Sequence, residues 1–323
     1  MSGPLTSRRE REEFLLKRQA AETLSEMEKF PQYLNIETSN ICNARCIMCG
    51  IDFDNRPKVQ MDDSLFTKIV QELAPWNHHV RQVNLFFDNE PLLDRNLARK
   101  IRILKDAGIR RVHLATNASA LTERRGRELL EAGLDELHIT IDSLEPKIYE
   151  QIRVGLSFDR VFKNSANFIR LRNDLGAKTL IRMQMVLQEL NMKEAEAFAD
   201  TWKPIMRQGD HIVVHRAHNW GGVVDTMAHS DDKHINSYPC GVLWANAMIH
   251  ADGRVALCSV DTEITSPHTL GDVRFQSIQE IWTGDAIREM RERHLNGDRN
   301  DHPLCNGCTT WREMANEIFI EVQ

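Results

Sequence analysis

Seven cysteines carry most of the chemistry available to this sequence, and they fall into two groups. The first group is Cys42, Cys46 and Cys49, with the spacing C-x3-C-x2-C. The second group lies almost 200 residues later and consists of Cys240, Cys258, Cys305 and Cys308. An odd number of thiols, in a chain whose first thirty residues contain no signal-peptide-like apolar core, argues against a disulfide scaffold. Metal or redox use is the expected role.

Each group predicts a different kind of site. Three thiolates on one short loop can bind three irons of a [4Fe–4S] cube and leave the fourth iron open. Zinc is an alternative, but a structural zinc site takes four ligands and this loop offers no fourth cysteine or histidine. Buried apolar cysteines are the third interpretation. The second group can supply four thiolates to one closed site, which would hold either an iron–sulfur cluster or a structural zinc ion.

Strand-like runs alternate with helix-like segments in the first two thirds of the chain. The runs are 33–39, 82–87, 111–116, 136–141, 179–186 and 211–216, and the helical segments are 62–73, 94–107, 122–132, 157–173 and 192–205. This alternation predicts parallel βα units, and six units form a partial (β/α)6 TIM-like barrel in an α/β fold. A doubly wound sheet is the alternative, although no GxGxxG follows the first run. Gly108, Gly133 and Gly176 are placed as helix stops.

The chain is expected to have four parts. Residues 1–30 form an N-terminal helical extension, in which a charged helix over 8–30 packs on one side, and residues 31–216 form the barrel. Residues 217–239 are a polar loop or linker. Residues 240–323 form a small α+β domain, with a hairpin around Asp252-Gly253 and a helix over 276–293.

Composition excludes several classes of protein. The net charge is −6 and the charged residues make up 27% of the chain, so binding to a nucleic-acid backbone is not expected. No apolar run approaches the roughly 18 residues that a membrane helix needs. We therefore expect a cytoplasmic protein with no membrane or nucleic-acid partner.

The first cysteine motif, placed after the first strand of a six-unit barrel, resembles the radical S-adenosylmethionine (SAM) superfamily. The resemblance implies that the open iron chelates SAM, which is cleaved to methionine and a 5′-deoxyadenosyl radical that abstracts hydrogen from a substrate. The second group, together with Leu270-Gly271 and Ile281-Trp282, resembles the shortened "twitch" form of the SPASM domain. This form implies one auxiliary [4Fe–4S] cluster whose irons are all ligated by cysteine, and hence two clusters in the chain.

The same resemblance implies four residues that bind SAM. Glu90 lies in the run Phe86–Pro91, where the family has Gly-Gly-Glu-Pro and the carboxylate holds the SAM ammonium group; here Asp88 and Asn89 replace the glycines. The other three positions are Asn117 after Thr116, Asp142 near the SAM ribose, and Arg153. Arg153 would contact a carboxylate of SAM or of the substrate, and a surface ion pair is the alternative.

The number of thiols bears on the reaction. Epimerases of this family commonly need a further cysteine to return a hydrogen atom, and none is left after three and four are assigned. The layout resembles the aminocyclitol-antibiotic dehydrogenases, which implies oxidation of a small-molecule alcohol, with a flavodoxin or ferredoxin as reductant. Epimerisation, peptide modification, decarboxylation and sulfur insertion are alternatives within the family. A tRNA-modifying enzyme, which the charge argues against, and a non-enzymatic zinc adaptor are alternatives of another kind.

Candidate substrate contacts come from strands and loops near these sites. Asp261, close to Cys258, is the candidate catalytic base, with a strand-end surface aspartate as the alternative. Polar residues at alternate positions in two strands are expected to face either a ligand in the barrel lumen or an internal hydrogen-bond network: His138, Thr140, Asp142, Arg182 and Gln184. Arg182 is the second catalytic candidate. Only one of His215 and Arg216 can point inward. Loop residues that could close over the substrate are His218, Trp220, His229 and His234.

Overall fold

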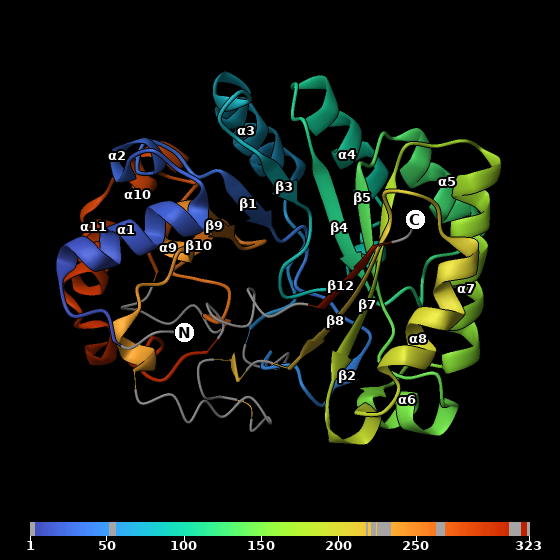
Figure 1. The fold of residues 1–323 in the computed structure, drawn as a ribbon. Helices are drawn as coiled ribbons and strands as arrows, with labels where there is room; N and C mark the ends of the chain where they lie inside the picture. The colour runs from blue at the N-terminus through green and yellow to red at the C-terminus, as the bar shows by residue number, and fades with distance from the viewer. Residues whose placement is uncertain are drawn as a thin grey trace.

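Six parallel strands follow one another in the sheet in their order along the chain (Figure 1). They are β1 (Tyr33–Ile36), β3 (Gln82–Asn84), β4 (Val112–Thr116), β5 (Glu136–Thr140), β7 (Leu180–Leu187) and β8 (His211–Arg216). Every neighbouring pair is parallel, which confirms the partial (β/α)6 barrel. This computed structural model describes residues 4–51, 56–217, 219–220, 224, 234–262, 269–309 and 318–321.

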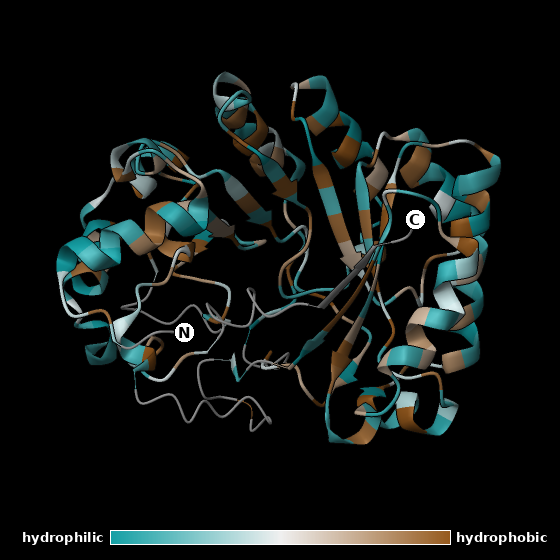
Figure 2. Cartoon of the chain, viewed as in Figure 1, coloured by the Kyte–Doolittle hydropathy of each residue, from teal (hydrophilic) through white to brown (hydrophobic). Residues whose placement is uncertain are grey.

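Helices follow five of the six strands on the outer side of the sheet (Figure 1). They are α3 (Asp63–Leu73), α4 (Leu97–Asp106), α5 (Glu123–Glu131), α7 (Phe158–Asp174) and α8 (Ala195–Trp202), and a short α6 (Pro146–Ile152) precedes α7. Gly108, Gly133 and Gly176 end three of these helices with φ of +82°, +85° and +60°. These conformations confirm the predicted helix stops, since glycine adopts positive φ without a Cβ clash. Figure 2 shows hydrophobic residues along the strands and on the helix faces that turn toward them.

The C-terminal part continues the same sheet. Strand β9 (Asn246–Ile249) pairs parallel to β1, and β10 (Arg254–Ala256) and β11 (Gly271–Asp272) follow as antiparallel neighbours. The predicted hairpin at Asp252-Gly253 is therefore present, with Gly253 at φ +94°. At the other edge, β12 (Ile318–Glu321) pairs antiparallel to β8, which gives a sheet of ten strands within the described residues.

The helices of the C-terminal part are shorter than expected. They are α9 (Val242–Ala245), α10 (Ile278–Trp282) and α11 (Asp285–Asn296). The single helix expected over 276–293 is wrong, because the chain turns at Thr283 and Gly284 between α10 and α11. A Cβ on Gly284 would lie 3.0 Å from the Glu280 carbonyl oxygen, so the turn is tight. Single 3-10 turns occur at Ala74–Trp76, Pro91–Leu93, Glu189–Asn191, Lys203–Ile205, Ile235–Ser237 and Arg299–Asp301.

The N-terminal segment forms two helices instead of one. Helix α1 (Arg8–Gln19) ends at Ala20, which adopts φ +48° and donates its N–H to the last turn of the helix, and α2 (Leu24–Met27) begins after the Thr23 cap. Arg11 is buried and donates from Nη1 to the Leu295 carbonyl oxygen at the end of α11 (3.2 Å). The extension thus packs against the C-terminal part, as Figure 1 shows.

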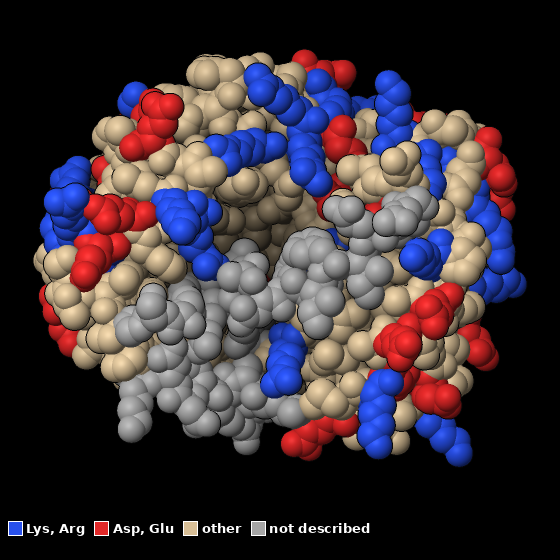
Figure 3. All heavy atoms as spheres, viewed as in Figure 1, with Lys and Arg blue, Asp and Glu red and all other residues tan. Residues whose placement is uncertain are grey.

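The surface carries both signs of charge. Figure 3 shows Lys and Arg interspersed with Asp and Glu over the visible face, which is hollowed near its centre. No helix in the described ranges is long and apolar enough to cross a membrane.

Candidate active site

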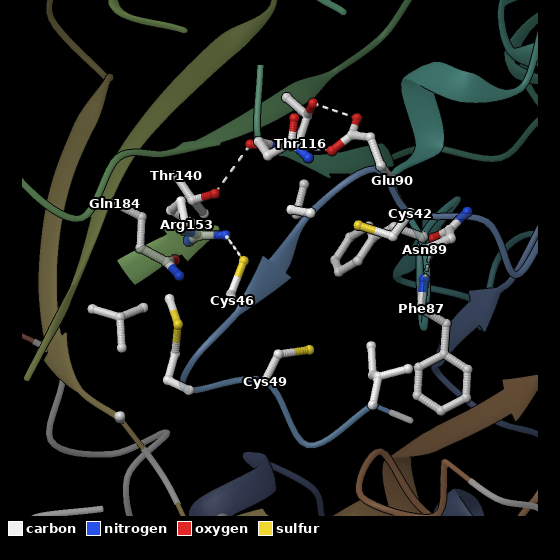
Figure 4. A pocket seen from close by; sticks show the side chains of 18 of the residues that line it. Cys42, Cys46, Cys49, Phe87, Asn89, Glu90, Thr116, Thr140, Arg153 and Gln184 are labelled. Atoms are coloured by element: carbon white, nitrogen blue, oxygen red, sulfur yellow. Dashed lines mark hydrogen bonds between the residues drawn. The ribbon is translucent and has the colours of Figure 1, made fainter. Parts of the chain in front are cut away.

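A cavity of about 360 Å³ opens at the carboxyl ends of the barrel strands, and we call it the central cavity. The three cysteines of the first group surround one space within it (Figure 4). Aromatic and aliphatic side chains, among them Phe86, Phe87 and Val186, form much of its wall. Its polar lining comprises Asn89, Glu90, Thr116, Asn117, Thr140, Arg153, Gln184 and His215.

A short ribbon holds the first cysteine loop against the barrel. Strand β2 (Arg45–Cys46) pairs antiparallel with β6 (Arg153–Val154), so that Cys46 lies opposite Arg153. The Ile47 N–H extends the pairing by donating to the Ile152 carbonyl oxygen (3.0 Å). The ribbon was not predicted, because two residues are too few to show a strand period.

Gly155 ends this ribbon at a close approach between two backbones. It adopts φ +94°, and a Cβ there would lie 3.2 Å from the Asn43 carbonyl oxygen. Gly155→Ala is therefore expected to lower the free energy of unfolding by about 2–3 kcal/mol and to reduce the iron bound at the first cysteine group. Urea unfolding and iron content of anaerobically reconstituted protein measure the two effects.

Gly176→Ala is the matched control for Gly155→Ala. Gly176 also has positive φ, but no atom lies within 4 Å of a Cβ built there. Only backbone strain of about 1 kcal/mol is expected, with no loss of iron. Equal losses of stability in the two variants would contradict a specific role for the approach to Asn43.

Trp220 closes the other side of the cysteine loop. Its indole Nε1 donates to the Met48 carbonyl oxygen (2.8 Å), and its ring lies so close to Gly50 that a Cβ there would be 2.8 Å from Cγ. Of the four predicted loop residues, Trp220 lines the central cavity. His234 caps the turn at Ile235–Ser237 and is not part of the lining. His218 and His229 lie outside the described residues.

Glu90 and Asn117 meet at the cavity wall. Glu90 Oε1 accepts hydrogen bonds from Thr116 Oγ1 (2.6 Å) and the Leu92 N–H (3.1 Å), and Oε2 accepts from the Asn117 N–H (2.8 Å). Burial raises the pKa of Glu90, although these three donors oppose the effect. A buried carboxylate held in this way favours a cation in the adjoining cavity.

Arg153 and Asp142 form a pair in which the arginine faces the cavity. Arg153 Nε donates to Asp142 Oδ2, and Nη1 lies 3.4 Å from Cys46 Sγ (Figure 4). Asp142 is completely buried, accepts the Val186 N–H at 2.8 Å, and is not part of the cavity lining. The alternative of a surface ion pair for Arg153 is therefore wrong, since the pair lies inside the protein.

Some of the polar residues on β5 and β7 face the central cavity, and others belong to an internal network. Thr140 and Gln184 line the central cavity. His138 Nε2 instead donates to Glu136 Oε1 (2.7 Å), and the His138 ring lies against the His113 ring, with 3.8 Å between centroids. Arg182 lies opposite His138 in the sheet and is not part of the cavity lining.

At the end of β8, neighbouring side chains point to opposite faces of the strand, so only one of the last two residues faces the central cavity. His215 lines the cavity and Arg216 is exposed, as the parity argument predicted.

The second cysteine group lies around the hairpin and the C-terminal turn. Cys240 precedes α9, Cys258 follows β10, and Cys305 and Cys308 follow the turn at Arg299–Asp301. Burial raises the pKa of Cys258 well above its ordinary value, and the other three thiols raise it further. Thiols that oppose the ionisation of Cys258 in this way fit a cationic centre, which would stabilise thiolates.

Phe87 lies between the two cysteine groups. It lines the central cavity, and it also packs against the apolar cluster of Val242, Met248 and Ala256, which Cys240 and Cys258 join. Its ring contacts His250 at 4.7 Å between centroids. Phe87 therefore contacts both the central cavity and the apolar cluster that Cys240 and Cys258 join.

A buried charged group that the sequence did not predict joins the barrel to the hairpin. Arg56 donates to Glu37 Oε1 (2.8 Å), Asp88 Oδ2 (3.3 Å) and His250 Nδ1 (2.9 Å). Glu37 also accepts the Ala251 N–H (2.8 Å). Three acidic or imidazole groups so close could hold a metal ion, but the Arg56 guanidinium already supplies the positive charge. The partners are as far as 214 residues apart in sequence, so no local pattern could reveal the group.

Asp261 is also buried, with 3% exposure, and is not part of the cavity lining. Its N–H donates to the Cys258 carbonyl oxygen (3.2 Å), and its carboxylate accepts the Leu257 N–H (3.3 Å). The alternative of a surface aspartate is therefore wrong, and the residue lies beside the second cysteine group.

Family models match both parts of the chain. Residues 36–201 match the radical SAM superfamily, and residues 240–309 match the SPASM iron–sulfur cluster-binding domain. The chain belongs to the radical SAM superfamily and carries a SPASM-type domain. Its cofactors are SAM and two [4Fe–4S] clusters, one that binds SAM and one auxiliary. The donor sets described above fit these groups: three thiols beside an open cavity, and four thiols in a closed site.

Individual relatives differ in how much of the chain they match. An SAM-dependent 2-deoxy-scyllo-inosamine dehydrogenase from Niallia circulans is 22% identical over 91% of this chain and 98% of its own length. A GTP 3′,8-cyclase from Limosilactobacillus fermentum is 30% identical over 43% of this chain, and the match spans 42% of the cyclase.

Solved structures share the fold at low identity. BtrN in complex with AdoMet and 2-DOIA superimposes with a TM-score of 0.58 at 20% identity, covering 87% of this chain and 93% of BtrN. SuiB from Streptococcus suis, bound to the precursor peptide SuiA, gives a TM-score of 0.66 at 13% identity and covers 85% and 72%. These likenesses support the fold and do not distinguish between small-molecule and peptide substrates.

Proposed function

We propose that the protein is a radical SAM dehydrogenase that oxidises an alcohol of a sugar- or aminocyclitol-type intermediate in natural-product biosynthesis. The distribution of thiols carries the proposal. Three lie at the central cavity, four lie in the second group, and the chain has no eighth cysteine to return a hydrogen atom as an epimerase would. The similarity to the dehydrogenase from Niallia circulans, which extends over nearly the whole chain, supports the same function.

In this proposal each cysteine group binds one cluster. Cys42, Cys46 and Cys49 ligate the SAM-binding cluster, and Cys240, Cys258, Cys305 and Cys308 ligate the auxiliary cluster. When bound, these groups supply one-electron cleavage of SAM at the first site and a one-electron acceptor at the second. To become the ketone, the alcohol loses a carbinol hydrogen atom, a hydroxyl proton and one electron. SAM, after it has gained one electron and this hydrogen atom, leaves as methionine and 5′-deoxyadenosine.

The residues of the cavity wall orient SAM and the substrate. Glu90, fixed by three donors, can accept a hydrogen bond from the SAM ammonium group, and Asn117 beside it offers a side-chain amide. Arg153 presents its guanidinium to a carboxylate, and Asp142 acts through Arg153 as a positioning residue for the ribose end. The apolar wall excludes water from the reacting atoms.

The proton acceptor in this proposal is Asp261. Asp261 lies within electrostatic reach of Asp88, whose chain neighbours Phe87 and Asn89 both line the cavity. A proton from the substrate would have to travel toward the second cysteine group, in the same direction as the electron. Arg182 lies opposite His138 in the sheet and is not part of the cavity lining. It is therefore proposed to act on the cavity indirectly, through the hydrogen-bonded residues around His138, without touching the substrate.

The substrate is proposed to be a small molecule with several hydroxyl or amino groups. Asn89, Thr140, Gln184 and His215 come from four different segments and converge on the cavity, which suits a ring with polar groups on many sides. The electron donor for the SAM-binding cluster is proposed to be a flavodoxin or a ferredoxin.

Anaerobic turnover tests the proposal. The reconstituted protein is incubated with SAM, a chemical reductant, and either 2-deoxy-scyllo-inosamine, related aminocyclitols or candidate precursor peptides. We expect an aminocyclitol product that has lost two hydrogen atoms, formed together with 5′-deoxyadenosine that contains deuterium when the carbinol carbon is deuterated. Incorporation of solvent deuterium at an unoxidised carbon would instead indicate epimerisation. Loss of hydrogen from a peptide alone would contradict the substrate class, and no cleavage of SAM would contradict the enzyme.

A further inference from the structure

A buried arginine binds the backbone that carries two cysteines of the second group. Arg299 is 1% exposed. Its Nε and Nη2 donate to the Cys305 carbonyl oxygen (3.2 and 2.7 Å), and Nη2 also donates to the Cys308 carbonyl oxygen (3.1 Å). Nη1 donates to the Tyr238 carbonyl oxygen (3.0 Å), two residues before Cys240. One guanidinium therefore holds the chain at three of the four thiols.

The electrostatic surroundings of the second group are positive on this side. Arg299 and Arg18 both lie within electrostatic reach of Cys240. His294 Nδ1 accepts the Cys240 N–H (3.0 Å), so this ring nitrogen carries no proton. Asp261 lies beside Cys258, where its N–H donates to the Cys258 carbonyl oxygen (3.2 Å).

The surroundings of the first group have the opposite character. The Glu90 carboxylate lies within electrostatic reach of Cys42. Asp88 lies within electrostatic reach of Cys49. The positive charge of Arg153 at Cys46 is balanced by Asp142.

We propose that Arg299 raises the reduction potential of the auxiliary cluster above that of the SAM-binding cluster and thereby makes it the electron acceptor. A cluster gains one negative charge when it is reduced, so a fixed positive charge close to its ligands favours the reduced form. Acidic residues near the first group have the reverse effect. The role as acceptor of the substrate electron rests on the proposed function, whereas the effect on the potential does not.

Redox titration of the two-cluster protein, followed by electron paramagnetic resonance, tests the proposal without any substrate. Arg299→Gln keeps hydrogen-bond donors and removes the positive charge. Arg299→Lys keeps the positive charge and removes the planar set of three donor nitrogens. We expect Arg299→Gln to shift the one-electron equilibrium of the auxiliary cluster at least tenfold toward the oxidised form, about 59 mV. Arg299→Lys should retain most of the wild-type potential. The potential of the SAM-binding cluster, measured in the same samples, should stay constant.

An unchanged auxiliary potential in Arg299→Gln, or an equal decrease in Arg299→Gln and Arg299→Lys, would overturn the proposal. If Arg299→Gln fails to bind the auxiliary cluster, Arg18→Gln decides the question, because Arg18 lies on α1 and is partly exposed. A smaller decrease in the same direction is expected there, and no decrease would overturn the proposal. Failure of the proposal for Arg299 would leave the proposed oxidation of an alcohol intact. Conversely, the wild-type protein could show the expected higher potential at the auxiliary cluster and oxidise no alcohol, and that result would contradict only the proposed function.

Discussion

Substitution of Cys46 by alanine is expected to stop the formation of 5′-deoxyadenosine. Cys46 lies opposite Arg153 in the β2–β6 ribbon and lines the central cavity together with Cys42 and Cys49. Two thiols cannot hold a cluster that also keeps one iron open for SAM. We expect the rate of SAM cleavage to fall by roughly three orders of magnitude, which corresponds to about 4 kcal/mol in the activation free energy.

Iron content distinguishes this loss from general misfolding. The wild-type chain is expected to bind about eight irons, and the Cys46→Ala chain about four, because the second group is untouched. Its auxiliary cluster should keep its spectrum and its potential. A Cys46→Ala protein that still cleaves SAM at the wild-type rate would contradict the assignment of the first group.

Substitution of Cys308 by alanine is expected to separate SAM cleavage from product formation. The Cys308 thiol belongs to the second group and is not part of the cavity lining, so the first group should assemble normally. We expect 5′-deoxyadenosine to form within about threefold of the wild-type rate, whereas ketone formation should fall at least about 100-fold. Both products are quantified from the same anaerobic reaction by mass spectrometry.

Each of the two cysteine variants serves as the experimental control for the other. Both remove one thiol, and both should lower the iron content by about half. They should differ in the ratio of 5′-deoxyadenosine to ketone, which is measurable for Cys308→Ala and undefined for Cys46→Ala because neither product forms. A Cys308→Ala protein that makes ketone at the wild-type rate would mean that the electron leaves by another route.

Features with a local signature were predictable from the sequence. The six barrel strands show as apolar runs between helical segments, and Gly108, Gly133 and Gly176 mark helix ends because no other residue adopts positive φ so readily. The spacing of Cys42, Cys46 and Cys49 identified the cavity where the cluster loop lies. Glu90 and Asn117, which the sequence predicts as SAM-binding residues, line this cavity.

Other features depend on contacts between distant segments. The break in the N-terminal helix occurs at Ala20, which adopts φ +48° without being a glycine, so composition could not reveal it. Arg56 and His250 meet although 194 residues separate them. The sequence predicts Asp142 near the SAM ribose, but its carboxylate is occupied by Arg153 and the Val186 N–H. Such pairings follow from packing, which no single segment encodes.

The pairing of β9 with β1 has a consequence for cooperativity. Strand β1 has barrel strand β3 on one side and β9 on the other, and four residue pairs join β1 to β9. Removal of the C-terminal part would expose the whole edge of β1, a template for aggregation, directly before the loop that carries Cys42. The two parts should therefore fold as one unit, and the distance between their clusters is fixed by backbone hydrogen bonds rather than by a flexible tether.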